Sequence, residues 1–155
     1  MKAIRPSEPA RAINRAIVMA APERSPDSDP HGLELVLVYG TLKRGQANHH
    51  RLEGCRWLGP ARLPGLALHD LGPFPMAVPC PEPDAVLQGE LVAVGVERLA
   101  ALDRFEGAPR LYERQRHRLH DGRPVWVYVG RPHQVRYVRR IPSGQWPQPW
   151  PAAPM

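Results

Sequence analysis

The stretch LVLVYGTLKRGQANHH, residues 35–50, joins an apolar run to a short polar and basic loop. We predict that Leu33 to Tyr39 forms a strand. Because both of its faces are largely apolar, this strand is expected to lie in the middle of its sheet. Gly40 follows at once, and a glycine at this position lets the backbone come close to a ligand. The loop that begins at Gly40 is therefore a candidate binding site.

Neither a phosphate site nor a metal site fits this loop. Gly40 begins a GxxxxG spacing, but Gln46 and Ala47 stand where a Walker A motif needs Lys and then Ser or Thr. His49 and His50 are adjacent, and adjacent side chains on a helix point in different directions and do not easily share one ion. The other histidines and the two cysteines have none of the spacings of zinc sites, so no metal is expected.

The composition is that of one small globular domain. A length of 155 residues allows one core, and 21 Lys and Arg against 15 Asp and Glu give a net charge of +6. Aromatic residues do not interleave with the basic stretches 114–118 and 136–140 in the way that a base-stacking surface requires, so a solvated basic face is expected rather than a nucleic-acid partner. No apolar run is long enough to span a membrane. Cys55 and Cys80 lie far apart without a CxxC pattern, which favours packing roles and a reducing, cytoplasmic location.

Proline content divides the chain into three parts, because prolines gather before residue 31 and after residue 141. We predict a disordered N-terminal arm over residues 1–32, a compact domain over 33–146 and a Pro-rich tail over 147–155. The apolar stretch 16–21 follows basic residues as in a signal peptide, but it is shorter than a usual one.

The compact domain is predicted to have an α+β fold. Apolar residues recur at intervals of three from Val96 to Phe105, which is typical of a short amphipathic helix, and Gly107 ends it. Residues 112–130 are predicted to form a hairpin with Asp121 and Gly122 as a two-residue turn. The sheet is expected to be small, mostly antiparallel and curled or barrel-like, with two short helices. The other expected elements are a short helix over 47–52, two extended pieces in 57–68 separated at Pro60 and Pro64, a rigid loop over 72–76 and a strand over 85–94.

Glu106 occupies an unusual place, on the last turn of the predicted helix. A carboxylate there faces the negative end of the helix dipole. The dipole and partial burial both favour the neutral form and raise the pKa of the carboxyl towards the range of a general base. From these residues alone, a solvated surface glutamate remains the alternative.

Two separated motifs resemble those of one known family. VYGTLKRGQANHH and LDRFEG followed by LYER are similar to the two signatures of the gamma-glutamylcyclotransferase-like (AIG2-like) proteins. They look closest to the gamma-glutamylamine cyclotransferase branch of that family. FPMAV, QGELVAV, WVYV and SGQW also follow in the expected order, so the resemblance covers roughly residues 34–146.

The resemblance implies a lyase- or transferase-type enzyme whose partner is a small γ-glutamyl substrate, an amine or an amino acid derivative. The substrate's own α-amino group attacks its γ-carbonyl, which yields 5-oxoproline and releases the free amine without a cofactor. Glu106 is then the general base and acid. Tyr39, Gly40, Thr41 and Leu42 bind the glutamyl group, largely through backbone N–H groups.

Residues beside the two motifs take supporting roles in this interpretation. Thr41 can donate its hydroxyl to the substrate or cap a turn. The expected supporting roles are pocket lining for Tyr112 and Tyr128, helix capping and loop bracing for Asn48 and His49, and solvent exposure for Lys43 and Arg44.

The alternative from another functional class is a non-catalytic module of the same fold that binds a small molecule or a partner. Retention of Glu106 argues against it, because such a module needs no general base. A third possibility is nucleic-acid binding through the arginine-rich hairpin. The amine half of the substrate and the oligomeric state are not readable from the sequence.

Overall fold

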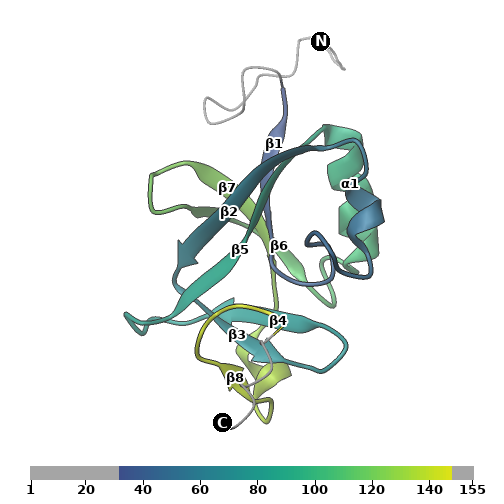
Figure 1. Cartoon of the computed structure of the whole chain (residues 1–155). Coiled ribbons are helices and arrows are strands. Elements are labelled where there is room, and N and C mark those ends of the chain that lie inside the picture. The colour runs from purple at the N-terminus through teal and green to yellow at the C-terminus, as the bar shows by residue number, and fades with distance from the viewer. Residues whose placement is uncertain (1–31, 148–155) are drawn as a thin grey trace, which may run out of the picture. The chain divides into compact units, whose positions relative to one another are not determined.

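The computed structural model describes residues 32–147, and those from Leu33 onward belong to one compact unit (Figure 1). The predicted N-terminal arm apart from Gly32, and the predicted tail apart from Pro147, lie outside the described residues. None of the described helices is long and apolar enough to cross a membrane.

Eight strands form two sheets in the described part of the chain. The central strand of the larger sheet is β1, which pairs antiparallel with β5 and parallel with β7. The larger sheet has the order β2 (Arg56–Pro64), β5 (Val86–Val94), β1 (Glu34–Val38), β7 (Pro124–Val129) and β6 (Glu113–Arg118). The smaller sheet has the order β4 (Pro75–Pro79), β3 (Leu66–Asp70) and β8 (Arg140–Ile141).

The α+β class and the central position of β1 are confirmed. Only the β1–β7 pair is parallel, so the pairing is mostly antiparallel, as predicted. Within residues 32–147 the larger sheet does not close into a barrel, because β2 and β6 each pair on one side only. The structure thus has two separate sheets where a single curled or barrel-like sheet was predicted.

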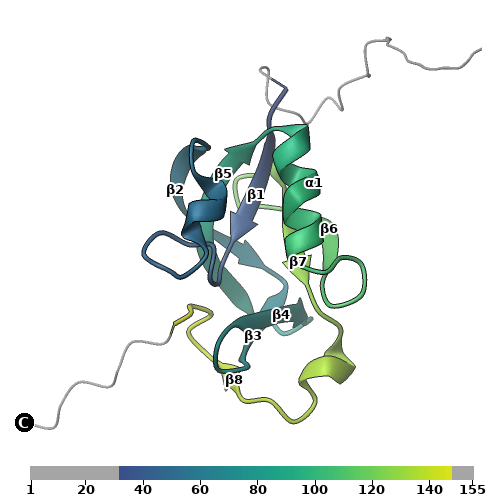
Figure 2. The ribbon, with the colours of Figure 1, turned by 90° about the vertical axis from the view of Figure 1, so that its right-hand side faces the viewer.

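One α-helix, α1 (Val96–Phe105), lies alongside β1 in Figure 2. It begins and ends where the period of three predicted. Two short 3-10 helices complete the described fold, η1 (His49–Leu52) and η2 (Pro132–Val135). The second predicted helix, over 47–52, is therefore a single 3-10 turn.

Alternate residues of β1 contact two different apolar clusters. Val36 and Val38 pack in a cluster with Leu99 and Leu102 of α1. Leu37 points the other way, into a cluster with Leu66 and Leu68 of the smaller sheet, among others. Because side chains alternate along a strand, the apolar residues of β1 have partners on both faces.

Three local predictions need correction. Pro60 does not interrupt a strand, because β2 is an edge strand whose pairing with β5 tolerates proline. Pro75 and Met76 begin β4 rather than ending a loop. The hairpin loop has three residues, since Leu119 N donates to Arg123 O at 2.8 Å, and Gly122 has a left-handed φ of 93°.

Candidate active site

A pocket of about 340 Å³ lies where β1 ends, between the loop after β1, the start of β4 and the C-terminal end of α1. It brings together segments that are more than sixty residues apart in the chain. Every residue predicted for the site lines it: Tyr39, Gly40, Thr41, Leu42, Glu106 and Tyr112, together with Tyr128.

The loop after β1 presents backbone donors to this pocket. Lys43 N donates to Gly40 O at 3.1 Å and closes a tight turn, and Asn48 N donates to Thr41 O at 2.8 Å. The N–H groups of Gly40, Thr41 and Leu42 have no acceptor among the described residues. Neighbouring free N–H groups of this kind can hold a carboxylate or an oxyanion.

The Thr41 hydroxyl is oriented by the same loop. Asn48 Nδ2 donates to Thr41 Oγ1 at 3.0 Å, so the threonine's own proton is free for another acceptor. Asn48 makes no side-chain cap to η1, whereas His49 Nδ1 lies 3.2 Å from Leu42 O. The predicted bracing role of Asn48 and His49 is therefore confirmed, and the predicted side-chain cap is wrong.

Gly40 allows β4 to approach the loop closely. A Cβ at this position would lie 2.9 Å from Cδ and 3.0 Å from Cγ of Pro75, closer than side chains normally pack. The Pro75 carbonyl in turn accepts a hydrogen bond of 2.7 Å from the Tyr112 hydroxyl. A side chain at residue 40 would therefore disturb both the loop and the wall of the pocket.

Glu106 is the C-terminal cap residue of α1, and its backbone N donates to Leu102 O at 2.8 Å. Within residues 32–147 its carboxylate has no hydrogen-bond or ion-pair partner. Burial raises the pKa of this carboxyl from its usual 4.5 to about 7. The predicted direction is confirmed, and desolvation is its cause. Such a carboxyl can take up and release a proton near neutral pH.

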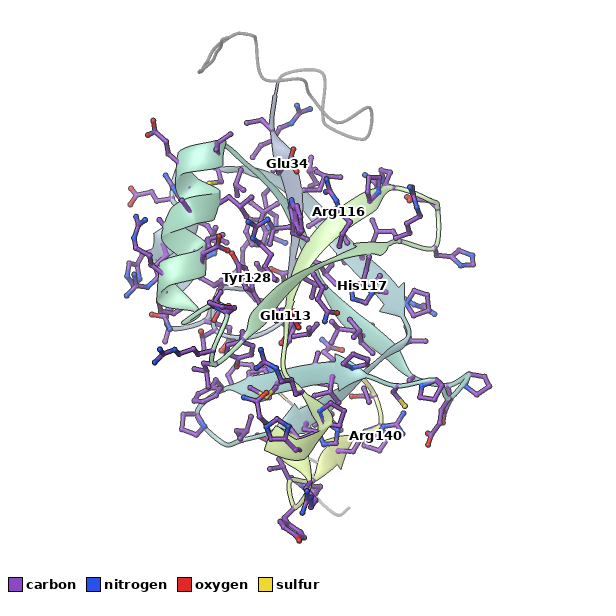
Figure 3. All side chains as sticks on the ribbon, turned by 180° about the vertical axis from the view of Figure 1, so that it is seen from behind. Glu34, Glu113, Arg116, His117, Tyr128 and Arg140 are labelled. Atoms are coloured by element: carbon purple, nitrogen blue, oxygen red, sulfur yellow. The ribbon has the colours of Figure 1, made fainter. Side chains whose placement is uncertain are left out.

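The tyrosine side chains around Glu106 are neutral and fixed. Burial raises the pKa of Tyr112 and that of Tyr128 above the usual value, and the nearby charge of Glu106 raises both further. Tyr128, which is labelled in Figure 3, donates its hydroxyl proton to Asp103 Oδ1 at 2.7 Å. Because Tyr112 and Tyr128 already donate to protein acceptors, their oxygens can only accept from a ligand.

The hydroxyl of Tyr39 is hydrogen-bonded within the protein. It donates to Tyr128 O at 2.5 Å and accepts from Ala77 N at 3.1 Å. The hydroxyl thus joins β7 to β4 and is fully used within the protein. Tyr39 can contribute its backbone and ring to the pocket, but its hydroxyl has a structural role.

The prediction that Lys43 faces solvent is wrong, whereas Arg44 is exposed as predicted. Lys43 is only 7% exposed, and its ammonium donates to Trp146 O at 2.5 Å. Arg44 N donates to Glu90 Oε1 at 3.0 Å, which ties the back of the loop to β5. A partner 103 positions away leaves no signal in the local sequence.

Asp103 is a residue that sequence reasoning missed. It accepts from Arg114 Nε at 2.8 Å as well as from Tyr128, and so holds that hydroxyl beside the pocket. Arg114 and Arg116 stack on the Trp126 ring at 4.1 and 4.2 Å. The arginine stretch at 114–118 is therefore engaged within the fold at two positions rather than forming a wholly solvated face.

The comparisons with known proteins agree with each other. The model of the family described as "Gamma-glutamyl cyclotransferase, AIG2-like" matches residues 36–148. The gamma-glutamylaminecyclotransferase of Homo sapiens is 37% identical over 53% of this chain and 59% of its own length. The gamma-glutamylcyclotransferase family protein YtfP of Escherichia coli is 32% identical over 72% of this chain and 94% of its own. The crystal structure of a mouse AIG2-like protein matches with a TM-score of 0.58 at 28% identity, over 64% of this chain and 78% of that one.

Proposed function

This chain belongs to the gamma-glutamyl cyclotransferase, AIG2-like family, and on that premise we propose that it converts γ-glutamyl amines or γ-glutamyl amino acids into 5-oxoproline and a free amine. One observation carries the proposal. Glu106, whose pKa is raised to about 7 by burial, has no hydrogen-bond or ion-pair partner among residues 32–147. It lies in the pocket that the N–H groups of Gly40, Thr41 and Leu42 also line, and these too have no acceptor among the same residues.

The proposed reaction begins with a proton transfer from the α-ammonium of the substrate to the Glu106 carboxylate. The freed amine attacks the γ-carbonyl carbon, a new C–N bond forms, and the carbonyl oxygen becomes an oxyanion. Backbone N–H groups of the loop are suited to stabilise this charge without reorganising. Collapse of the intermediate breaks the bond to the departing nitrogen, which receives the first proton from Glu106. Glu106 then takes the second proton from the ring nitrogen and passes it to the departing amine, which leaves as an ammonium ion.

The proton balance leaves the enzyme unchanged. Of the three protons on the α-ammonium, one stays on the lactam nitrogen and two end on the departing ammonium. The nucleophile and the electrophile belong to the same molecule, so the pocket contributes mainly by folding the substrate. Well-oriented intramolecular reactions reach effective molarities of roughly 10⁵–10⁸ M.

The direct test is a search for the product. Purified protein incubated with γ-glutamyl-n-butylamide, γ-glutamyl-ε-lysine and γ-glutamylalanine is expected to release 5-oxoproline from at least one of them, measured by mass spectrometry. Thermal stabilisation by one of these compounds without turnover would instead support a non-catalytic binding module. If none of these compounds is turned over and none stabilises the protein, the proposal as a whole is contradicted.

The pH dependence gives a second test. Because the general base must be ionised in the free enzyme, kcat/KM is expected to rise with pH and to level off above about 7, the pKa of Glu106. Initial rates at low substrate concentration over a pH series measure this profile. A plateau that already begins near 4.5, the usual value for the carboxyl, would contradict the assigned environment of Glu106.

We infer that residues 33–146 carry this activity and that the protein works in the cytoplasm. The free thiols of Cys55 and Cys80 support the location, because a reducing compartment keeps cysteines unpaired.

A further inference from the structure

The segment that follows Glu106 is a compact turn at the mouth of the pocket. Gly107 has a left-handed φ of 68°, and its carbonyl accepts from both Arg110 N and Leu111 N at 2.9 Å. A Cβ on Gly107 would lie 3.2 Å from Cβ of Leu111, so the two residues pack closely. The turn over residues 107–111 therefore fixes where Leu111 lies relative to Glu106.

Two residues at η2 hold this turn from outside. Arg131 donates from Nη2 to Pro109 O at 2.8 Å and from Nη1 to Arg110 O at 3.0 Å. Gln134 Nε2 donates to Leu111 O at 3.0 Å, and its Oε1 accepts from Arg131 N at 2.6 Å. Three consecutive carbonyl groups of one turn are thus bound by two side chains, and the Gln134 side chain is also bonded to the Arg131 backbone.

The side chain held in this way is apolar and exposed. Leu111 is 46% exposed although it is a large hydrophobic residue, and it lines the pocket. The other exposed lining residues, Ala47 and Pro73, are also apolar. An apolar group of a ligand would remove this rim from water, and burial of apolar surface is favourable.

Charge sets a second condition on the ligand. Among the described residues that line the pocket there is no Lys, Arg or His, and Glu106 is the only carboxylate. A carboxylate on the departing half of the substrate would therefore meet an apolar rim without a cation. An uncharged alkyl or aryl group would meet only apolar neighbours there.

We propose that Leu111 determines the specificity for the amine half of the substrate, with Arg131 and Gln134 as its positioning residues. The favoured class is γ-glutamyl amides of amines whose first carbons form an uncharged alkyl chain. This inference rests on the proposed function, since it concerns the half of the substrate that leaves the same pocket. Arg131 and Gln134 act only through the turn that they hold.

The test is a homologous series of γ-glutamyl amides of methylamine, ethylamine, propylamine and butylamine. For the unaltered protein, kcat/KM is expected to rise about two- to fourfold for each added methylene, the range for a partly to fully buried CH₂. Leu111→Ala is expected to flatten this rise while changing the value for the methylamide about twofold at most. γ-Glutamylalanine, which carries a carboxylate on its departing half, is expected to be a poorer substrate in the unaltered protein than γ-glutamyl-3-methylbutan-2-ylamide, in which an isopropyl group of similar shape replaces that carboxylate.

The positioning residues are tested on the same series. Arg131→Ala and Gln134→Ala are each expected to flatten the rise, because the turn is then free to move Leu111 away from the departing chain. Arg136→Ala is the matched control, since Arg136 is exposed, lies at the end of η2 and places its guanidinium over the ring of Tyr137. A purely structural role for Arg131 would lower all rates equally and leave the slope of the series intact.

The outcomes separate this inference from the proposed function. Release of 5-oxoproline with no dependence on chain length, or with a dependence that survives Leu111→Ala, would overturn the inference alone. Absence of 5-oxoproline from every amide would overturn the proposed function first. Because Leu111 is half exposed, its replacement by alanine leaves the core intact, and a urea unfolding curve checks this for each variant.

Discussion

Replacement of Glu106 by glutamine is expected to lower 5-oxoproline formation by about 10²–10⁴-fold, the usual contribution of a positioned general base. Glutamine has nearly the same shape but cannot accept the proton of the α-ammonium. In the described residues no other carboxylate lines the pocket, so no neighbour can replace it. Product release from saturating and from limiting γ-glutamyl-n-butylamide measures kcat and kcat/KM separately.

Glu97→Gln is the matched control for this variant. Glu97 lies on the first turn of the same helix, is exposed, and is expected to change the rate less than twofold. An active Glu106→Gln protein would remove the basis of the proposed mechanism.

The folding stability of Glu106→Gln provides an independent check. A carboxyl whose pKa is about 7 in the folded protein and 4.5 in the unfolded chain binds its proton more tightly when folded. Its contribution to the free energy of unfolding is therefore present below pH 4.5 and is lost as the pH rises to about 7. Above that pH the glutamine variant is expected to be at least as stable as the unaltered protein. Lost activity in a destabilised protein would be explained by misfolding instead.

Replacement of Gly144 by alanine is expected to destabilise the fold by more than about 3 kcal/mol, the sum of left-handed backbone strain and an overpacked contact. Gly144 has a φ of 72°, and a Cβ there would meet the Val86 carbonyl oxygen at a distance of 1.9 Å. That oxygen belongs to the backbone of β5 and cannot move without disturbing its pairing. Urea denaturation followed by tryptophan fluorescence measures the loss.

Gly122→Ala separates the two causes of that loss. Gly122 has a similar φ of 93°, but a Cβ there would have no neighbour within 4 Å. Its replacement is expected to cost about 1–2 kcal/mol, the backbone term alone. Equal costs at both positions would show that the contact with Val86 contributes nothing.

Gly144→Ala is also expected to disturb the loop of the candidate site. Gly144 O accepts from Gln88 N at 2.8 Å, and two residues later the Trp146 carbonyl accepts from the buried Lys43 ammonium. A displaced Trp146 would leave that ammonium without its acceptor, which is costly for a buried charge. Because Lys43 closes the turn that presents the N–H groups, KM is expected to rise in the folded fraction.

Local patterns in the sequence predicted much of the fold. The apolar run of β1 requires cover on both faces, and the structure places it at the centre of the larger sheet. The period of three over Val96–Phe105 and the glycine after it defined α1, because both act between neighbours in the chain. The hairpin was also predicted, but its loop length was wrong by one residue, since DG signals a turn without fixing the register.

The residues that line the candidate site were predicted, but the hydrogen bonds that hold them in place were not. The motif around Gly40 and the glutamate at the end of the helix pointed to residues that the structure brings into one pocket. The use of the Tyr39 hydroxyl between β4 and β7, the burial of Lys43 and the clamp from Arg131 were not predicted. Each depends on an acceptor far away in the sequence.

The sequence by itself therefore determined β1, β5, the hairpin of β6 and β7, the helix and the residue types available for chemistry, because periodicity and glycine conformation are properties of neighbouring residues. Only the tertiary structure decided which polar groups are used up inside the protein and which remain free. Tyr39 and Lys43 have their donors occupied, whereas the N–H groups of Gly40–Leu42 and the carboxylate of Glu106 have no hydrogen-bond partner among the described residues. Burial and hydrogen bonding depend on what packs against a group, and for these residues the packing partners come from β4, β7, α1 and the last described residues of the chain.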